Sequence, residues 1–233
     1  MNQAIISGAS AGIGAETAVR LLAQGWKVTN LSRRPCPVSG VTSIACDFAD
    51  PAAVNAVCAQ LAGSVAGSAR TVLIHNASLL RNDSAGATSD ADFRHVLQVN
   101  LAAPNALNTA LLPLLRSGSA VIYVGSTLAE KAVPNSYSYV ITKHAIIGMM
   151  RATCQDLAGS GVHTACVCPG FTDTEMLRSH LGDDPETRAA VASMSAFGRL
   201  ITPEEIADTI IWAATHPVIN GAVIHANLGQ RER

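Results

Sequence analysis

The chain has 233 residues, of which 48% are hydrophobic and 14% are charged, and its formal net charge is -1. A chain of this length and apolar content suits one well-buried domain, and the balanced charge argues against a nucleic-acid partner. No apolar run approaches the roughly 20 residues of a membrane helix, and the first residues lack a signal-peptide pattern, so we expect a cytoplasmic protein with no membrane partner.

Short apolar runs alternate with longer stretches of helical periodicity along the chain. Seven runs are predicted to be strands, at residues 3–7, 26–32, 41–46, 71–76, 120–125, 163–168 and 221–226. Helices are predicted between and after them, at residues 15–24, 51–61, 90–115, 136–160 and 203–214. Because most of the strands are continuously apolar, we expect a sheet that is covered on both faces. The predicted fold class is therefore α/β, a Rossmann-like doubly wound, seven-stranded and mostly parallel sheet with helices on both faces.

Two features interrupt this regular alternation. Pro104 and Pro113 fall within the predicted helix at 90–115, and a proline inside a helix kinks or ends it. Residues 170–199, between a strand and a helix, are too many for an ordinary connection, and segments of this length are usually lids or binding loops. No repeat or linker marks a second domain, so we predict one domain spanning 1–233 with a lid at about 170–199.

Six cysteines are present. Cys166 and Cys168 lie two residues apart, but no second cysteine pair has the spacing of a zinc site. We therefore predict no metal, and expect the cysteines to be reduced and to pack as small buried side chains.

The stretch IISGASAGIG places Gly8, Gly12 and Gly14 directly after the first predicted strand and at the start of the first predicted helix. Glycines there let the backbone approach a pyrophosphate, and the helix N-terminus supplies free N–H groups and the positive end of a dipole. Glycines also form plain tight turns, but the position between a strand and a helix favours dinucleotide binding.

The end of the second predicted strand bears on which dinucleotide binds. A site that prefers NAD carries an acid there for the ribose 2′-hydroxyl. Here the stretch TNLSRRP has no acid, and Ser32 is followed by Arg33 and Arg34. A guanidinium binds a phosphate with two parallel hydrogen bonds. We therefore predict NADP(H) with Arg33 as the main contact, although NAD(H) is possible and a solvated basic turn is the alternative interpretation.

The stretch NSYSYVITK holds two tyrosines and a lysine. On a helix, Tyr139 and Lys143 are four residues apart and separated by about 40° around the axis, whereas Tyr137 lies about 120° from the lysine. Only Tyr139 can therefore share a face with Lys143. A nearby ammonium favours the phenolate form of a tyrosine, which suits the tyrosine to proton transfer with a carbonyl or alcohol oxygen.

Ser126 stands thirteen residues before Tyr139. The spacing of this serine, the tyrosine and the lysine is specific enough to indicate one protein family. Over nearly its whole length the chain resembles the short-chain dehydrogenase/reductase family, in its compact single-domain form. The resemblance implies a catalytic set of Asn100, Ser126, Tyr139 and Lys143. Ser126 would hold the reacting oxygen, Tyr139 would act as acid or base, and Lys143 would bind the nicotinamide ribose. Asn100 would help to hold the water chain that resupplies protons.

The family's cofactor motifs are also present. Asp47 and Phe48 of CDFAD would border the adenine, and HNAS agrees with the family's Asn-Asn-Ala-Gly motif at Asn76 and Ala77. The motif CPGFTDTEM matches the turn that faces the nicotinamide and its phosphate. The full set of implied cofactor contacts is Gly8, Ser10, Gly12, Ile13, Gly14, Ser32, Arg33, Asp47, Phe48, Asn76, Ala77, Tyr139, Lys143, Pro169, Gly170, Thr172 and Thr174.

The function that the resemblance implies is an oxidoreductase that transfers a hydride between NADP(H) and a carbonyl or alcohol substrate, with tyrosine as the general acid or base. The alternative is a catalytically silent NADP(H)-binding sensor or scaffold protein. Another reaction on the same framework, such as nucleotide-sugar epimerisation, fits less well because only about thirty residues follow GRLITP.

Several assignments stay open on the sequence alone. Thr127 is an alternative to Ser126 as the working hydroxyl, and Tyr137 lines the substrate side or simply packs. The segments near the predicted site are mostly apolar, which indicates a modest, largely uncharged small-molecule substrate. Glu130 and Lys131 either orient a polar substituent or are solvated. Relatives commonly form dimers or tetramers, so we expect a homodimer or homotetramer.

Overall fold

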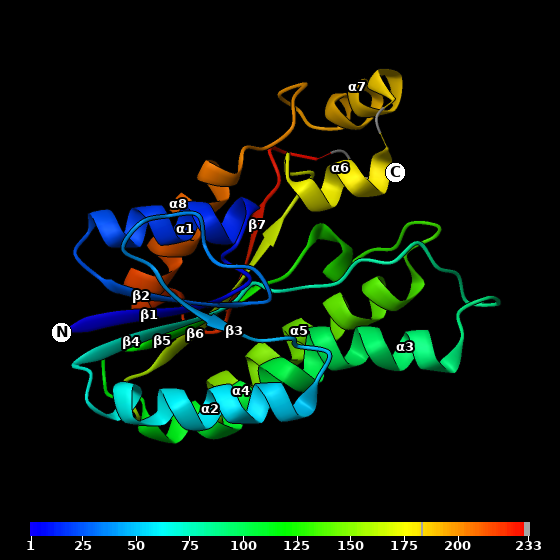
Figure 1. Cartoon of the computed structure of the whole chain (residues 1–233). Helices are drawn as coiled ribbons and strands as arrows, with labels where there is room; N and C mark the ends of the chain where they lie inside the picture. The colour runs from blue at the N-terminus through cyan, green and yellow to red at the C-terminus, as the bar shows by residue number, and fades with distance from the viewer. Residues whose placement is uncertain (183, 231–233) are drawn as a thin grey trace.

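The computed structural model describes residues 1–182 and 184–230, and its centre is one seven-stranded sheet (Figure 1). All six neighbouring strand pairs are parallel, in the order β3-β2-β1-β4-β5-β6-β7. The strands are β1 (Asn2–Ser7), β2 (Lys27–Ser32), β3 (Thr42–Ala45), β4 (Arg70–His75), β5 (Ala120–Val124), β6 (His163–Pro169) and β7 (Ala222–Ala226). The predicted doubly wound, Rossmann-like sheet is confirmed, and its strand order reverses between β1 and β4.

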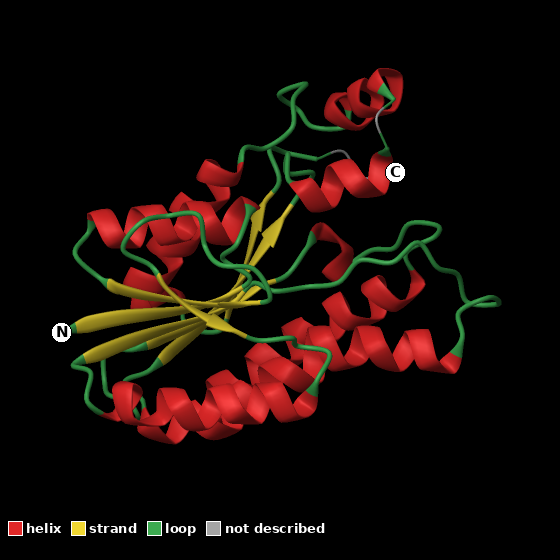
Figure 2. Cartoon of the chain, viewed as in Figure 1, coloured by secondary structure: helices red, strands yellow, loops and turns green. Residues whose placement is uncertain are grey.

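Helices cover both faces of the sheet (Figures 1 and 2). They are α1 (Gly12–Ala23), α2 (Pro51–Ala66), α3 (Asp90–Leu97), α4 (Ala103–Leu111), α5 (Tyr137–Asp156), α6 (Glu175–Leu181), α7 (Pro185–Ser193) and α8 (Pro203–Thr215). Helices α1 and α8 pack on one face, and α2, α4 and α5 pack on the other. Helices α6 and α7 stand beyond the end of the strands.

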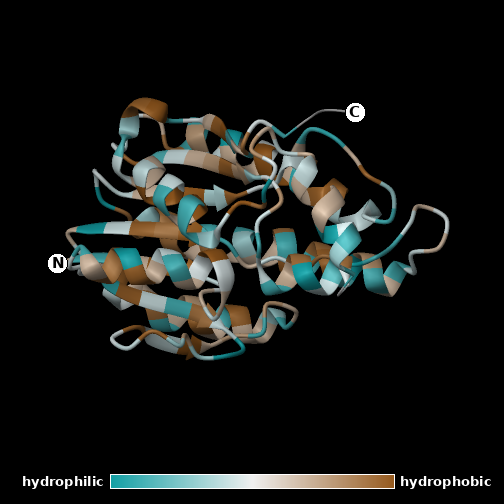
Figure 3. Cartoon of the chain, turned by 90° about the horizontal axis from the view of Figure 1, so that it is seen from above, coloured by the Kyte–Doolittle hydropathy of each residue, from teal (hydrophilic) through white to brown (hydrophobic). Residues whose placement is uncertain are grey.

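The central strands are rich in apolar residues because alternate side chains enter two different cores. Ile5 belongs to the core under α2, α4 and α5, while its neighbours Ala4 and Ile6 belong to the core under α1 and α8. In β5, Tyr123 belongs to the core under α2, α4 and α5, and its neighbour Ile122 belongs to the core under α1 and α8. The long hydrophobic stretches of the central strands are visible in Figure 3. Burial on both faces explains why the strand pattern lacks a polar alternation.

The helix predicted at 90–115 is interrupted, as its prolines indicated. A π-helical turn at Gln98–Ala102 separates α3 from α4, and a 3-10 turn at Leu112–Leu114 contains Pro113. Pro104 has no N–H to donate to the carbonyl of Asn100, four residues earlier, so the regular hydrogen-bond ladder cannot continue through this point. The resulting π turn carries the predicted catalytic Asn100.

The segment 170–199 contains two short helices that periodicity did not predict. Thr174 caps α6 and Asp184 caps α7, with Pro185 at the first helical position. Such short helices present too few residues for an apolar repeat, but their capping residues are normal start signals. A role for this segment as a lid stays a prediction. Within the described part of the chain, no helix is both long and apolar enough to cross a membrane.

A buried polar network joins β4 and β5 to the helices beneath them. The Nε2 atom of His75 lies 2.8 Å from Oδ1 of Asn108, and Asn108 donates from Nδ2 to the Tyr123 hydroxyl at 2.8 Å. The same hydroxyl lies 3.0 Å from Oγ1 of Thr153. Burial lowers the pKa of His75 to about 4, although the contact with Asn108 opposes this shift. The ring is therefore neutral in the folded protein at neutral pH.

The buried His75 ring predicts a loss of stability in acid. Its folded-state pKa is about 4, below the unfolded value of about 6.5, so the unfolded chain takes up the proton first as the pH falls. Between pH 7 and pH 4.5 this one group should cost about 2 kcal/mol of unfolding free energy. Urea denaturation across this range should show a flatter pH dependence for His75→Asn than for the unchanged protein. The exposed His144→Asn should not flatten it, and parallel curves for His75→Asn would contradict the prediction.

Candidate functional site

The glycine loop lies at the carboxyl end of β1, beside the point where the strand order reverses. Gly8 and Gly12 have φ angles of 75° and 54°, in the region that favours glycine. A Cβ on Gly14 would lie 2.4 Å from the Gly8 carbonyl oxygen. Helix α1 therefore packs directly on the loop, and the absence of side chains leaves the backbone open to a ligand. Ser10 is half-buried in this loop, and Ile13 packs against the core under α1.

The first turn of α1 is suited to an anion. Among the described residues no side chain caps this helix, and its first turn contains no acid. The N–H groups at the start of a helix need partners and carry the positive end of its dipole. A pyrophosphate would supply acceptors for these groups.

Asn76, at the end of β4, is tied to the glycine loop. Its Nδ2 atom donates to the carbonyl oxygens of Ser7 and Gly8, both at 3.0 Å. The Ser7 hydroxyl oxygen accepts from the backbone N–H groups of Asn76 and Ala77, at 2.9 and 3.0 Å. These four bonds fix the floor of the predicted cofactor site between β1 and β4. Ser7 was not among the predicted site residues, because its role depends on contacts about seventy residues away along the chain.

The turn after β2 is organised by Asn30, another residue that the sequence analysis did not select. Its Oδ1 atom accepts from the Ala9 N–H at 2.9 Å, and its Nδ2 atom donates to the Ser32 hydroxyl at 3.1 Å and to the Arg34 carbonyl at 3.3 Å. Asn30 thereby joins the glycine loop to the turn where a 2′-phosphate would bind. Arg33, the predicted main contact, is exposed on this turn.

Arg34 connects this turn to the start of α6. Its guanidinium pairs with the Glu175 carboxylate at 2.9 and 3.4 Å, and this pair lowers the pKa of Glu175. Glu175 is the first residue of α6. The turn after β2 and the segment predicted as a lid are therefore in contact through two exposed side chains.

The two residues predicted to border the adenine differ in exposure. Asp47 is exposed after β3, and its Oδ1 atom accepts from the Ala49 N–H at 3.0 Å. The Phe48 side chain is buried in the core under α2, and its carbonyl accepts from Nε2 of Gln98 at 3.2 Å. The side chain that reaches solvent at this position is therefore that of Asp47.

The predicted shared face of Tyr139 and Lys143 is confirmed. Both residues are buried on α5, and the Lys143 Nζ atom lies 5.3 Å from the centroid of the Tyr139 ring. Nζ also donates to the Val124 carbonyl at 2.8 Å, which joins α5 to the end of β5. Tyr137 points elsewhere, because it is exposed and stacks on Phe93 with 6.0 Å between ring centroids.

Ser126 follows β5 at the start of a 3-10 turn. Its Oγ atom accepts from the Leu128 N–H at 3.1 Å, and the residue is half-buried. Thr127, the alternative hydroxyl, is buried. The partial exposure of Ser126 is the more compatible of the two with contact to a substrate.

Asn100 lies in the π turn and connects three segments. Its Oδ1 atom accepts from the Leu79 N–H at 2.7 Å, and its Nδ2 atom donates to the Leu79 carbonyl at 3.0 Å and to Oγ1 of Thr142 at 2.9 Å. Thr142 is the residue before Lys143. Asn100 thus fixes both the loop after β4 and the helix that carries the tyrosine and the lysine.

The turn at Pro169 and Gly170 continues from β6. The Gly170 N–H donates to the Ala226 carbonyl at 3.0 Å, and Oγ1 of Thr172 donates to the Gly170 carbonyl at 3.0 Å. A Cβ on Gly12 would lie 3.2 Å from Cγ2 of Thr174. The segment after β6 therefore passes directly against the glycine loop.

Behind Ser126, two thiols fill the space beside Gly125. The Sγ atoms of Cys166 and Cys168 are 3.8 Å apart, and a Cβ on Gly125 would lie 2.8 and 2.6 Å from them. All six cysteines are free thiols. Among the described residues, no group of three or more His, Cys, Asp or Glu side chains could hold a metal ion.

These features define a class of α/β protein that binds a dinucleotide at the carboxyl edge of its sheet. A family model described as Enoyl-(Acyl carrier protein) reductase matches residues 8–231. The chain is 30% identical over 240 residues to 2-(R)-hydroxypropyl-CoM dehydrogenase of Xanthobacter autotrophicus, with 95% of each chain covered. It is 31% identical over 246 residues to the short-chain reductase protein NovJ of Streptomyces niveus, with 97% of this chain and 93% of the relative covered.

The fold of the chain is also similar to that of a solved dehydrogenase structure. Ligand-free aldohexose dehydrogenase from Thermoplasma acidophilum is similar with a TM-score of 0.90 and 26% sequence identity, over 98% of this chain and 93% of that one. The chain therefore belongs to the short-chain dehydrogenase/reductase family, whose members are oxidoreductases that bind NAD(P)(H) and act on small molecules. The open glycine loop and the uncapped first turn of α1 fit the pyrophosphate of such a cofactor.

The close packing at Gly14 allows a direct test of whether the glycine loop binds the cofactor. In Gly14→Ala the new Cβ would meet the Gly8 carbonyl oxygen at 2.4 Å and Nδ2 of Asn76 at 2.7 Å. We expect a loss of about 1–3 kcal/mol in unfolding free energy and a more than tenfold rise in the Kd for NADPH, measured by fluorescence titration. Gly63→Ala is the matched control, because this α2 glycine has nothing within 4 Å of its would-be Cβ. NADPH binding within twofold of the unchanged protein would contradict the prediction for Gly14→Ala.

Proposed function

We propose that the protein catalyses reversible hydride transfer between NADP(H) and a small carbonyl or alcohol compound, with Tyr139 as the general acid or base. The observation that carries this proposal is the buried Lys143 ammonium, 5.3 Å from the centroid of the Tyr139 ring. A second support is the half-buried Ser126, which follows β5 two residues after the carbonyl that Lys143 contacts.

The cofactor, when bound, supplies or accepts the hydride. In the direction of reduction, the Tyr139 hydroxyl gives its proton to the carbonyl oxygen of the substrate. The Ser126 hydroxyl donates a hydrogen bond to the same oxygen and orients it. Lys143 favours the charge that develops on the phenol oxygen as the proton leaves. Oxidation of an alcohol uses the same residues in reverse.

Asn100 and Lys143 have further roles in this proposal. Lys143 binds the nicotinamide ribose, and Asn100 helps to hold the water chain through which protons return. The contacts of Asn100 with Leu79 and with Thr142 support the second role, since they hold its side chain beside the residue that precedes the lysine.

The proposed preference for NADP(H) rests on the turn after β2. The strand ends without an acid, and Arg33 and Arg34 follow it in exposed positions. Arg33 is the proposed contact to the 2′-phosphate, since Arg34 is engaged by Glu175. The remaining cofactor contacts follow the glycine loop, Asn76 and the turn after β6.

The proposed substrate is modest in size and largely uncharged. Half-buried apolar residues follow Ser126 and the Pro169–Gly170 turn, among them Leu128 and Phe171, and Glu130 pairs with His225 at 3.1 Å rather than standing free. The segment at 170–199 would close over this substrate as a lid. We further propose a cytoplasmic homodimer or homotetramer.

Removal of the Tyr139 hydroxyl tests the proposed chemistry. Tyr139→Phe should lower kcat at least a thousandfold, because the acid or base of the reaction is lost, while the Kd for NADPH stays within about threefold. Absorbance loss of NADPH with a panel of ketones and aldehydes measures the rate. Tyr137→Phe is the matched control and should retain turnover, because Tyr137 points away from Lys143. Retained activity in Tyr139→Phe would reject the mechanism, and no turnover of any carbonyl by the unchanged protein would favour the silent binder.

Arg33→Ala tests the cofactor preference. A charge-assisted pair with the 2′-phosphate is lost, so the Kd for NADPH should rise about tenfold while the Kd for NADH changes by less than twofold. Arg94→Ala removes another exposed guanidinium, which pairs with Asp90 on α3, and should change neither constant. Tighter binding of NADH than of NADPH by the unchanged protein would reject the preference itself.

A further inference from the structure

The loop after β4 meets the start of α5 at Asp83. The Asp83 N–H donates to the Asn135 carbonyl at 3.2 Å, and the Asp83 carbonyl accepts from the Tyr137 N–H at 3.2 Å. These two bonds form an isolated parallel bridge between Asp83 and Ser136. A segment more than fifty residues earlier in the chain thus runs alongside the residues that lead into α5.

The Asp83 side chain continues this contact into the helix. Its Oδ1 atom accepts from the Ser138 N–H at 3.1 Å. Tyr137 and Ser138 are the first two residues of α5, and their N–H groups have no acceptor within a regular helix. One residue, Asp83, therefore supplies acceptors to two of the four N–H groups that the start of this helix leaves unsatisfied.

The N-terminus of helix α5 has no side-chain cap of its own among the described residues. Its own N-cap residue, Ser136, makes no side-chain capping bond to any described residue, and the first turn of α5 contains no acid. A carboxylate at a helix N-terminus provides both a hydrogen-bond acceptor and a charge that suits the helix dipole. Asp83 therefore caps the N-terminus of α5, although it belongs to a different segment of the chain.

The hydrogen bonds between Asp83 and the start of α5 matter for the site because Tyr139 directly follows Ser138. The tyrosine lies in the first turn of α5, and the first turn is where helices fray. Toward the other end of the loop, Asn100 holds Leu79 and Thr142 together. The tyrosine is thus bracketed by two contacts between the loop after β4 and α5.

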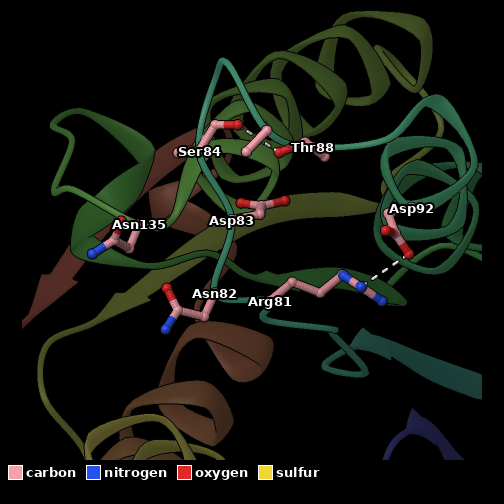
Figure 4. A pocket seen from close by; sticks show the side chains of 8 residues that line it. Arg81, Asn82, Asp83, Ser84, Thr88, Asp92 and Asn135 are labelled. Atoms are coloured by element: carbon pink, nitrogen blue, oxygen red, sulfur yellow. Dashed lines mark hydrogen bonds and ion pairs between the residues drawn. The ribbon is translucent and has the colours of Figure 1, made fainter.

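Figure 4 shows Asp83 among the residues of a cavity of about 200 Å³, which also include Arg81, Asp92 and Asn135. Asp92 faces Arg81 at 2.9 Å and belongs to α3. The second Asp83 oxygen, Oδ2, is buried and has no partner among the described residues. The bond to Ser138 therefore requires only Oδ1, which an asparagine also provides.

We infer that Asp83 is a positioning residue for the reaction, which acts by clamping the first turn of α5 so that the Tyr139 hydroxyl stays in place for proton transfer. This inference rests on the proposed function of Tyr139. Small displacements of an acid or base from its working position cost about one to two orders of magnitude in rate.

The test compares Asp83→Ala, Asp83→Asn and Asp92→Ala in steady-state kinetics with NADPH and a carbonyl substrate. Asp83→Ala should lower kcat between about tenfold and a hundredfold, with the Kd for NADPH within twofold of the unchanged protein. Asp83→Asn keeps the Oδ1 acceptor and should recover kcat to within about threefold. Asp92→Ala, a change at an acid of the same cavity, should leave kcat near its original value. An unaffected Asp83→Ala, or an Asp83→Asn as impaired as Asp83→Ala, would overturn the inference.

A second measurement needs no substrate. Backbone amide exchange, followed by mass spectrometry, should be faster in a peptide spanning 136–143 of Asp83→Ala and unchanged in one spanning α4. Unchanged exchange at 136–143 would overturn the clamp whatever the kinetics. Tyr139→Phe, assayed alongside, separates the two proposals. An active Tyr139→Phe rejects the proposed function, whereas an inactive Tyr139→Phe beside a fully active Asp83→Ala rejects only the role of Asp83.

Discussion

The hydrogen bond from the Lys143 ammonium to the Val124 carbonyl fixes the geometry on which the candidate site depends. A buried ammonium is costly unless it is hydrogen-bonded, so this 2.8 Å contact holds α5 against the carboxyl end of β5. Val124 precedes Ser126 by two residues, and Tyr139 lies one helical turn before Lys143. This contact therefore helps to set the distance between the strand that ends near the serine and the helix that carries the phenol, together with the core packing of α5.

Around this contact, three asparagines connect backbone segments that are distant in the sequence. Asn30 joins the glycine loop to the turn after β2, Asn76 joins the same loop to the end of β4, and Asn100 joins the loop after β4 to α5. A carboxamide has both donors and an acceptor, so one side chain can satisfy the polar groups of two segments. These side chains thereby tie the loops at the carboxyl edge to one another.

The sequence predicted the sheet and the Tyr139–Lys143 pair because both follow from a local period. Strands buried on two faces are continuously apolar, and a spacing of four residues places two side chains on one helical face. The residues that it missed, Ser7, Asn30 and Asp83, act through contacts made across 21 to 70 residues of chain, which no local period encodes. Helices α6 and α7 were missed for the opposite reason, since each is too short to display a period at all.

The contact between Gly125 and the two thiols has a consequence for how this sequence can vary. The sulfur atoms of Cys166 and Cys168 occupy the volume that any side chain at position 125 would need. Interiors are packed too closely to absorb an extra carbon at this point without rearrangement. The three positions therefore behave as one steric unit, and a larger residue at 125 is compatible with the fold only when smaller residues replace the cysteines. Among natural relatives, these positions should covary.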